Sequence, residues 1–205
     1  MSPEVFGLLV TFCIYKGKEG INVLADITYF EKCTDENITD IINLLQKKFK
    51  TSLKWSIEQV DVRNIIPLCK HVYNDRLEYA QKSISKCIQY GVPLFYPYVA
   101  HYNNGDTHLV LPPIVEERNQ KLYLGDGMHR MYCMRELDIS TAYVLITREC
   151  MLPLPGKPQI WSSVKKNPIQ LPVHMNFEGF VRTGLTGYSK FCNSNIFWKK
   201  LEEKK

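Results

Sequence analysis

The sequence contains no Cys-x-x-Cys pair, although seven of its residues are cysteines. Without such a pair, a structural zinc site or a thioredoxin-like redox motif is not expected. The cysteines are odd in number and scattered, and Cys87 and Cys133 fall at apolar positions of segments with helical periodicity. This pattern is typical of reduced thiols that fill a core, and it favours a cytoplasmic protein.

Long apolar runs are missing as well. The run over residues 6–14 is too short to span a bilayer, and it has no cleavage signature. The sequence also has no internal repeat and no low-complexity tract. These absences argue against a membrane partner, a secretory signal and a repeat architecture.

Positively charged residues are only slightly in excess of negatively charged ones. The chain has 26 Lys and Arg residues against 21 Asp and Glu residues, a formal net charge of +5. A mildly basic chain can contact nucleotides, nucleic acid or acidic surfaces, and the charge alone does not choose among them. The hydrophobic content of 45% in 205 residues supports a folded core rather than disorder.

The N-terminal part of the chain is predicted to form a β-β-α unit. Residues 5–14 and 21–30 are β-rich apolar runs with a glycine-containing loop between them. Thr34 or Asp35 would cap a helix whose apolar residues recur at helical spacing. No residue in this unit suggests chemistry, so it is treated as an N-terminal extension (residues 1–55).

The central part of the chain shows alternating strand and helix signals. Residues 57–66 and residues 108–117 are each predicted to form one strand. Between them lies a helix with Asn74 or Asp75 as its cap and Gly91 as its stop. The predicted buried stripe of this helix comprises Leu77, Ala80, Ile84, Cys87 and Ile88.

Two further segments accompany this central part. Asn103–Asp106 is a clear turn, so residues 95–107 predict either an added hairpin or a substrate lid, with the hairpin favoured. Residues 151–205 are rich in Pro and aromatic residues, which indicates an irregular extension that packs on the body.

Residues 121–137 carry the most distinctive pattern, a short strand, a glycine-flanked turn and a helix. Gly125 and Gly127 bracket the turn, where positive φ or close backbone approach is easiest. Met131 and Met134 then recur at helical spacing. A helix N-terminus offers N–H groups without helical partners and the positive end of the helix dipole, which together suit a phosphate or other anion.

Residue types alone leave two interpretations of this turn open. In the first, His129 and Arg130 add donors and positive charge to an anion site, and Asp126 holds a cation such as Mg²⁺. In the second, Gly-Asp-Gly is only a tight turn, Asp126 is only an N-cap, and the His-Arg pair is a solvated helix start. The turn has no mechanism as specific as that of a Walker A loop.

Four short motifs follow one another between residues 60 and 147. They are Ile66-Pro67, Arg76-Leu77-Glu78-Tyr79-Ala80, Pro112-Pro113-Ile114-Val115 and Gly125-Asp126-Gly127-Met128-His129-Arg130. Together, and in this order, they resemble the ParB/sulfiredoxin-like superfamily, most closely its free serine kinase branch. The resemblance implies an α/β (α+β) fold, with a small mixed β-sheet and packed helices in a nucleotide-binding core over residues 56–150.

The resemblance also implies that the glycine turn binds a nucleotide, ATP or ADP, with Mg²⁺. The backbone amides of Gly127 and Met128 would hold phosphate oxygens, and Asp126 would organise the metal or the accepting hydroxyl. The implied activity is phosphoryl transfer to a small hydroxyl-bearing molecule, as in a small-molecule kinase, or ATP hydrolysis. The residues that the resemblance implicates in the site are Gly125, Asp126, Gly127, Met128, His129 and Arg130.

Two departures from the family pattern bear on catalysis. Sulfiredoxins place a catalytic cysteine where this chain has Met128, which is no nucleophile, so sulfinate repair is not expected. Serine kinases carry a catalytic glutamate two residues after the strand-ending proline, and here that position after Pro67 is Cys69. His71 is then the candidate general base, with Asp75 and Glu78 as alternatives.

Three other functions remain open. ParB-type relatives use this turn to bind a nucleotide that gates a DNA clamp, but no helix-turn-helix segment is evident after residue 151. Glu116 and Glu117 could hold metal ions in a DNA nuclease, although neighbouring strand residues point to opposite faces. A fold that binds its ligand without catalysis would account for the missing glutamate.

Overall fold

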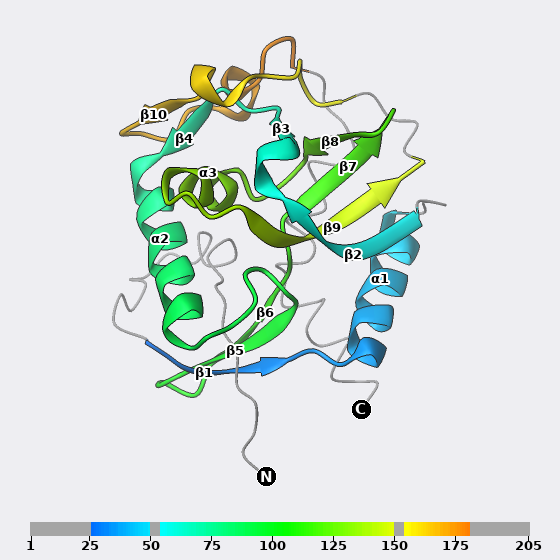
Figure 1. The fold of residues 1–205 in the computed structure, drawn as a ribbon, viewed down its shortest axis with the longest axis vertical. Coiled ribbons are helices and arrows are strands. Elements are labelled where there is room, and N and C mark those ends of the chain that lie inside the picture. Colours follow the sequence, from blue (N-terminus) through cyan, green and yellow to red (C-terminus); the bar gives the residue numbers. More distant parts are fainter. Residues whose placement is uncertain (1–25, 50–53, 150–153, 181–205) are drawn as a thin grey trace.

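The computed structural model describes residues 26–49, 54–149 and 154–180 of the chain (Figure 1). Within these residues three β-sheets and three α-helices form a mixed structure, which confirms the predicted α/β (α+β) fold class. The predicted strand over residues 5–14 lies outside the described residues. No helix among them is long and apolar enough to cross a bilayer.

The central sheet has five strands in the order β2-β9-β7-β8-β3. The β9–β7 and β8–β3 pairs are parallel and the β2–β9 and β7–β8 pairs are antiparallel, so the sheet is mixed. The strands are β2 (Lys54–Asp61), β9 (Thr141–Arg148), β7 (Ile114–Arg118), β8 (Lys121–Leu124) and β3 (Ile65–Pro67).

The prediction of one strand over residues 57–66 is wrong, because β2 and β3 lie at opposite edges of this sheet. Only the 3-10 turn η1 (Val62–Asn64) joins them, and the carboxylate of Asp61 caps it by accepting a hydrogen bond from the Arg63 N–H at 2.8 Å. Four residue steps span at most about 14 Å, whereas the edges of a flat five-stranded sheet lie about 19 Å apart. The sheet therefore curls until its edges approach each other.

A second, antiparallel sheet has the order β1-β5-β6 and lies at the opposite end of the molecule from β4 (Figure 1). Its strands are β1 (Ile27–Lys32), β5 (Tyr98–Tyr102) and β6 (Thr107–Val110). β5 and β6 form a hairpin, as predicted for the segment 95–107, although its second strand continues to Val110. Because β1 pairs with β5, the described part of the N-terminal extension shares a sheet with the central part of the chain.

The prediction of one strand over residues 108–117 is also wrong. β6 and β7 belong to different sheets, and Leu111–Pro113 separates them. Pro112 and Pro113 have no N–H to contribute to a ladder, which explains why strand pairing is interrupted there.

The helices are α1 (Asp35–Phe49), α2 (Asn74–Gln89) and α3 (Met128–Glu136), and α3 packs against α2. Thr34 caps α1 as predicted, since its hydroxyl accepts a hydrogen bond from the Asn37 N–H at 3.2 Å. The cap predicted for α2 is wrong, because Asn74 is already helical and Tyr73 precedes it without a side-chain cap. The predicted stripe of α2 is buried except at Ile88, which is 62% exposed.

The described part of the C-terminal segment lies against the start of α2. It contains η2 (Trp161–Ser163), β10 (Lys165–Asn167) and η3 (Val173–Asn176). β10 pairs in parallel with β4 (His71–Tyr73). The indole Nε1 of Trp161 also donates to the carbonyl of Ile65 at 2.7 Å. The domain boundaries at residues 55 and 150 stay predictions.

Candidate functional site

The strand, turn and helix predicted over residues 121–137 are confirmed. β8 leads into the turn Gly125–Gly127, and α3 begins at Met128. Gly127 has a φ of 88°, and a Cβ built on it would lie 2.6 Å from the Cβ of Pro113. Glycine is therefore required here, because a side chain would strain the backbone and collide with the proline ring.

Two amide groups of the turn are used inside the fold. The N–H groups of Gly125 and Asp126 both donate to the carbonyl of Ile114, at 2.8 and 3.1 Å. The first hydrogen bond of α3 ends on the carbonyl of Gly127, so the N–H groups of residues 128–130 have no acceptor within the helix. The part of the turn that suits an anion is thus the helix N-terminus, and the Gly125 amide serves the turn itself.

Arg130 is a buried cation in the first turn of α3. Its side chain is 9% exposed and its Nη2 lies 3.5 Å from Oδ2 of Asp126. Its Nη1 donates to the carbonyl of Leu111 at 2.7 Å, and its guanidinium carbon lies 5.3 Å from the centre of the Phe95 ring. Burial lowers the pKa of Arg130, and the Asp126 carboxylate opposes that change. This environment excludes the interpretation of Arg130 as a solvated residue.

His129 is neutral rather than cationic. Its side chain is buried, and its Nε2 accepts a hydrogen bond from the backbone N–H of Tyr73 at 3.0 Å. Burial is the largest cause that lowers the pKa of His129 to about 4, and the charge of Arg76 adds to it. A neutral ring that accepts at Nε2 carries its proton on Nδ1. His129 therefore ties the start of α3 to the start of α2 and does not supply positive charge.

The depressed pKa of His129 predicts an acid-sensitive fold. Because the folded pKa of about 4 lies below the ordinary value of 6.5, the unfolded chain binds more protons between these values. The stabilisation is complete above pH 6.5 and is lost as the pH falls towards about 4. We expect a loss of roughly 3 kcal/mol in the free energy of unfolding across this window, measured by urea denaturation at a series of pH values.

The matched variant is His129→Gln, whose side-chain oxygen can still accept the Tyr73 hydrogen bond but does not titrate. We expect this variant to lose most of the pH dependence. His71→Gln serves as the control, because the pKa of His71 is also lowered but its side chain is more exposed. Equal pH dependence in wild type and His129→Gln would contradict the assignment.

The charge of Asp126 acts on Cys69, a residue that the motifs did not single out. The side chain of Asp126 is 22% exposed. Burial, and then the charge of Asp126, raise the pKa of the Cys69 thiol to about 12, so this thiol stays protonated and is no nucleophile. Met128, 8% exposed, belongs to the hydrophobic core. Cys69 stands two residues after Pro67, the position of the catalytic glutamate in the serine kinases that the motifs resemble, and this position is the signal that could have identified it.

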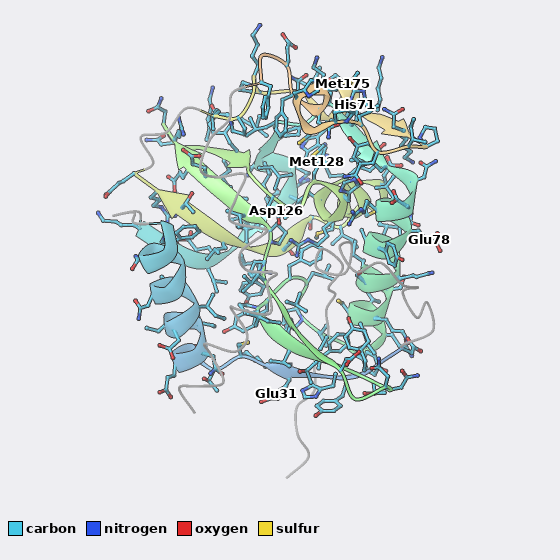
Figure 2. The ribbon with its side chains drawn as sticks, turned by 180° about the vertical axis from the view of Figure 1, so that it is seen from behind. Glu31, His71, Glu78, Asp126, Met128 and Met175 are labelled. Carbon is cyan, nitrogen blue, oxygen red and sulfur yellow. The ribbon has the colours of Figure 1, made fainter. Side chains whose placement is uncertain are left out.

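His71 occupies a different environment from the glycine turn. Burial lowers its pKa first, followed by the charges of Lys70 and Lys165, whereas a hydrogen bond with Asn176 raises it. Figure 2 shows His71 next to Met175 at one end of the molecule, with Asp126 nearer the centre. The candidate base is thus neutral, and it faces the C-terminal segment.

The predicted metal site has one carboxylate. Within the described residues no group of three or more His, Cys, Asp and Glu side chains could hold a metal ion. Mg²⁺ in nucleotide sites is commonly held by one or two carboxylates together with phosphate oxygens, so Asp126 suits Mg²⁺ only alongside a bound phosphate. Glu116 is 2% exposed and pairs with Arg118, whereas Glu117 pairs with Arg148, so the two carboxylates do not converge.

Comparisons with known proteins add no relative. No protein family, no curated protein and no solved structure matches the chain. The likeness to the ParB/sulfiredoxin-like superfamily therefore rests on the four sequence motifs and stays a prediction.

Proposed function

We propose that this protein binds ATP or ADP through phosphate groups at the N-terminus of α3, and that it transfers a phosphoryl group to a small hydroxyl-bearing molecule. The observation that carries the proposal is the junction of β8 and α3. There Gly127 packs against Pro113 at positive φ, so the chain enters a nine-residue helix through a turn that only glycine can form. Such a junction presents helix N–H groups and a positive dipole end to an anion.

The neighbouring charges have separate roles in this proposal. Arg130 is buried, so its positive charge acts through a medium of low dielectric and favours an anion at the helix start. Mg²⁺, when bound, neutralises charge on the phosphate oxygens. Asp126 would hold that ion. His129 fixes the start of α3 to the start of α2 through its hydrogen bond with the Tyr73 N–H.

In this proposal His71 is the general base, with Asp75 and Glu78 as alternatives. His71 has a lowered pKa and is neutral at physiological pH, as a base must be. Glu78 is exposed and pairs with Lys82 at 2.8 Å, and Asp75 lies 3.8 Å from Arg76. The absence of a glutamate after Pro67 favours the second candidate function, a nucleotide-binding module without catalysis. The proposal includes a cytoplasmic location, which the scattered cysteines of the sequence favour.

Asp126→Asn tests the catalytic part. We expect the variant to bind nucleotide but to lose the strengthening of binding by Mg²⁺, because the amide is a poor ligand for this ion. Consumption of ATP or ADP in the presence of L-serine or glycerol, followed by ³¹P NMR, should fall at least about 100-fold. Asp138→Asn is the control, since Asp138 is exposed and follows α3 at its other end.

The outcomes separate the two candidate functions. Turnover in wild type that Asp126→Asn abolishes supports phosphoryl transfer. Nucleotide binding without any turnover in wild type supports the binding module. Unchanged turnover in Asp126→Asn would show that the reaction takes place elsewhere in the chain.

A further inference from the structure

Phe95 has a backbone conformation that a bulky side chain disfavours. Its φ is 66°, in the loop between α2 and β5. A bulky residue adopts positive φ only at a cost, and it persists there where the surrounding structure holds it in place. The phenyl ring is fully buried. Glycine would form the same loop with less strain, so the ring at this position requires a separate explanation.

The two neighbours of Phe95 in the chain hold its backbone in place. The carbonyl of Leu94 accepts a hydrogen bond from the N–H of Tyr143, in β9, at 2.9 Å. The ring of Tyr96 packs edge-on against the ring of Tyr143, with 5.1 Å between the ring centres. Residues on both sides of Phe95 are thus attached to one residue of the central sheet, and this attachment fixes the loop at Phe95.

The buried ring of Phe95 lies against the guanidinium of Arg130. The guanidinium carbon is over the ring, 5.3 Å from its centre, which is within the range of a cation–π contact. The polar contacts of this guanidinium are a hydrogen bond from Nη1 to the carbonyl of Leu111 at 2.7 Å and a longer approach of Nη2 to Asp126 at 3.5 Å. Its Nε is buried without a hydrogen-bond partner among the described residues. Polar contacts therefore restrain the guanidinium only at its Nη atoms, and the ring supplies a further restraint.

We infer that Phe95 is a positioning residue, whose ring holds the guanidinium of Arg130 beside Asp126 at the start of α3. The face of an aromatic ring attracts a cation, and the attraction is strongest where water is excluded. The consequence for ligand affinity rests on the proposed nucleotide binding at this site. There a fixed positive charge favours the phosphate groups of ATP or ADP, so full affinity requires an aromatic ring at position 95. The segment 95–107, which forms the added hairpin, thereby contributes its first residue to the site.

The test replaces the ring and follows the guanidinium directly. Phe95→Leu removes the aromatic face and keeps an apolar side chain. Phe30→Leu is the matched control, because Phe30 is also fully buried and its ring packs against the ring of Tyr90. The Nε–Hε signal of Arg130 is followed by ¹H–¹⁵N NMR and assigned by its disappearance in Arg130→Lys. We expect this signal to move in Phe95→Leu, and its hydrogen exchange to become about tenfold faster, with neither change in Phe30→Leu.

Nucleotide affinity is the second readout. Calorimetry with ATP and Mg²⁺ should show about tenfold weaker binding in Phe95→Leu than in wild type or Phe30→Leu. If Phe95→Leu does not fold, Phe95→Met takes its place, since a flexible methionine fills irregular gaps in a core. An Arg130 signal that moves in the Phe95 variant alone supports the inference, and a wild type that binds no nucleotide would then contradict only the proposed function. An unmoved Arg130 signal, or the same loss of ATP affinity in both variants, would overturn the inference.

Discussion

Gly127→Ala is expected to lower the free energy of unfolding by about 3 kcal/mol. A residue with a Cβ pays about 1–2 kcal/mol for the left-handed conformation that Gly127 adopts at a φ of 88°. The new Cβ would also lie 2.6 Å from the Cβ of Pro113, and overpacking of this kind costs about 1–3 kcal/mol. Pro113 cannot easily yield, since its carbonyl accepts a hydrogen bond from Leu145 at 2.8 Å. Urea denaturation measures the loss.

Gly91→Ala is the matched control for this variant. Gly91 also has positive φ, at 66°, but nothing lies within 4 Å of a Cβ built on it. This variant isolates the conformational cost, about 1–2 kcal/mol. If both variants lose the same stability, the contact between Gly127 and Pro113 does not constrain the turn.

Arg130→Ala is expected to cost about 3–4 kcal/mol in the free energy of unfolding. Removing one member of a buried ion pair leaves its partner uncompensated, and here the partner, Asp126, is still 22% exposed, which moderates the loss. The carbonyl of Leu111 also loses its donor, and a cavity opens beside Phe95. Thermal and urea denaturation of the purified variant would measure the change.

Two further variants divide this effect into its parts. Arg130→Met fills the space without charge, and Arg130→Met combined with Asp126→Asn should recover part of the lost stability, because neither side chain is then a charge without a partner. Arg63→Ala removes an exposed arginine that pairs with Asp61 at 2.6 Å, and its effect should be much smaller. An equal loss in Arg130→Ala and Arg63→Ala would show that Arg130 is not buried in the way described.

Local signals were sufficient to predict several elements. The glycines at 125 and 127 and the methionine spacing after them located the turn and α3, because positive φ and helical periodicity depend on neighbouring residues. The threonine cap of α1 and the Asn103–Asp106 turn were predicted for the same reason.

Features that depend on tertiary pairing were not predictable in this way. Residues 57–66 are continuous in apolar pattern, yet the curled sheet separates them into strands at its two edges. The sequence predicts that His129 adds positive charge to the site. In the structure its burial makes it neutral, and its ring accepts a hydrogen bond from the Tyr73 N–H. The parallel pairing of β10 with β4 joins segments that are distant in sequence, and the sequence carries no local signal for it.

The central claim is that the N-terminus of α3 binds nucleotide phosphates, and calorimetry tests it most directly. ATP, ADP, CTP and GTP are titrated with and without Mg²⁺ into wild type and into Asp126→Asn. We expect a purine nucleotide to bind wild type, more tightly with Mg²⁺, and the Mg²⁺ dependence to disappear in the variant. Binding of none of the four nucleotides, with or without Mg²⁺, would contradict the claim and leave the glycine turn a structural element.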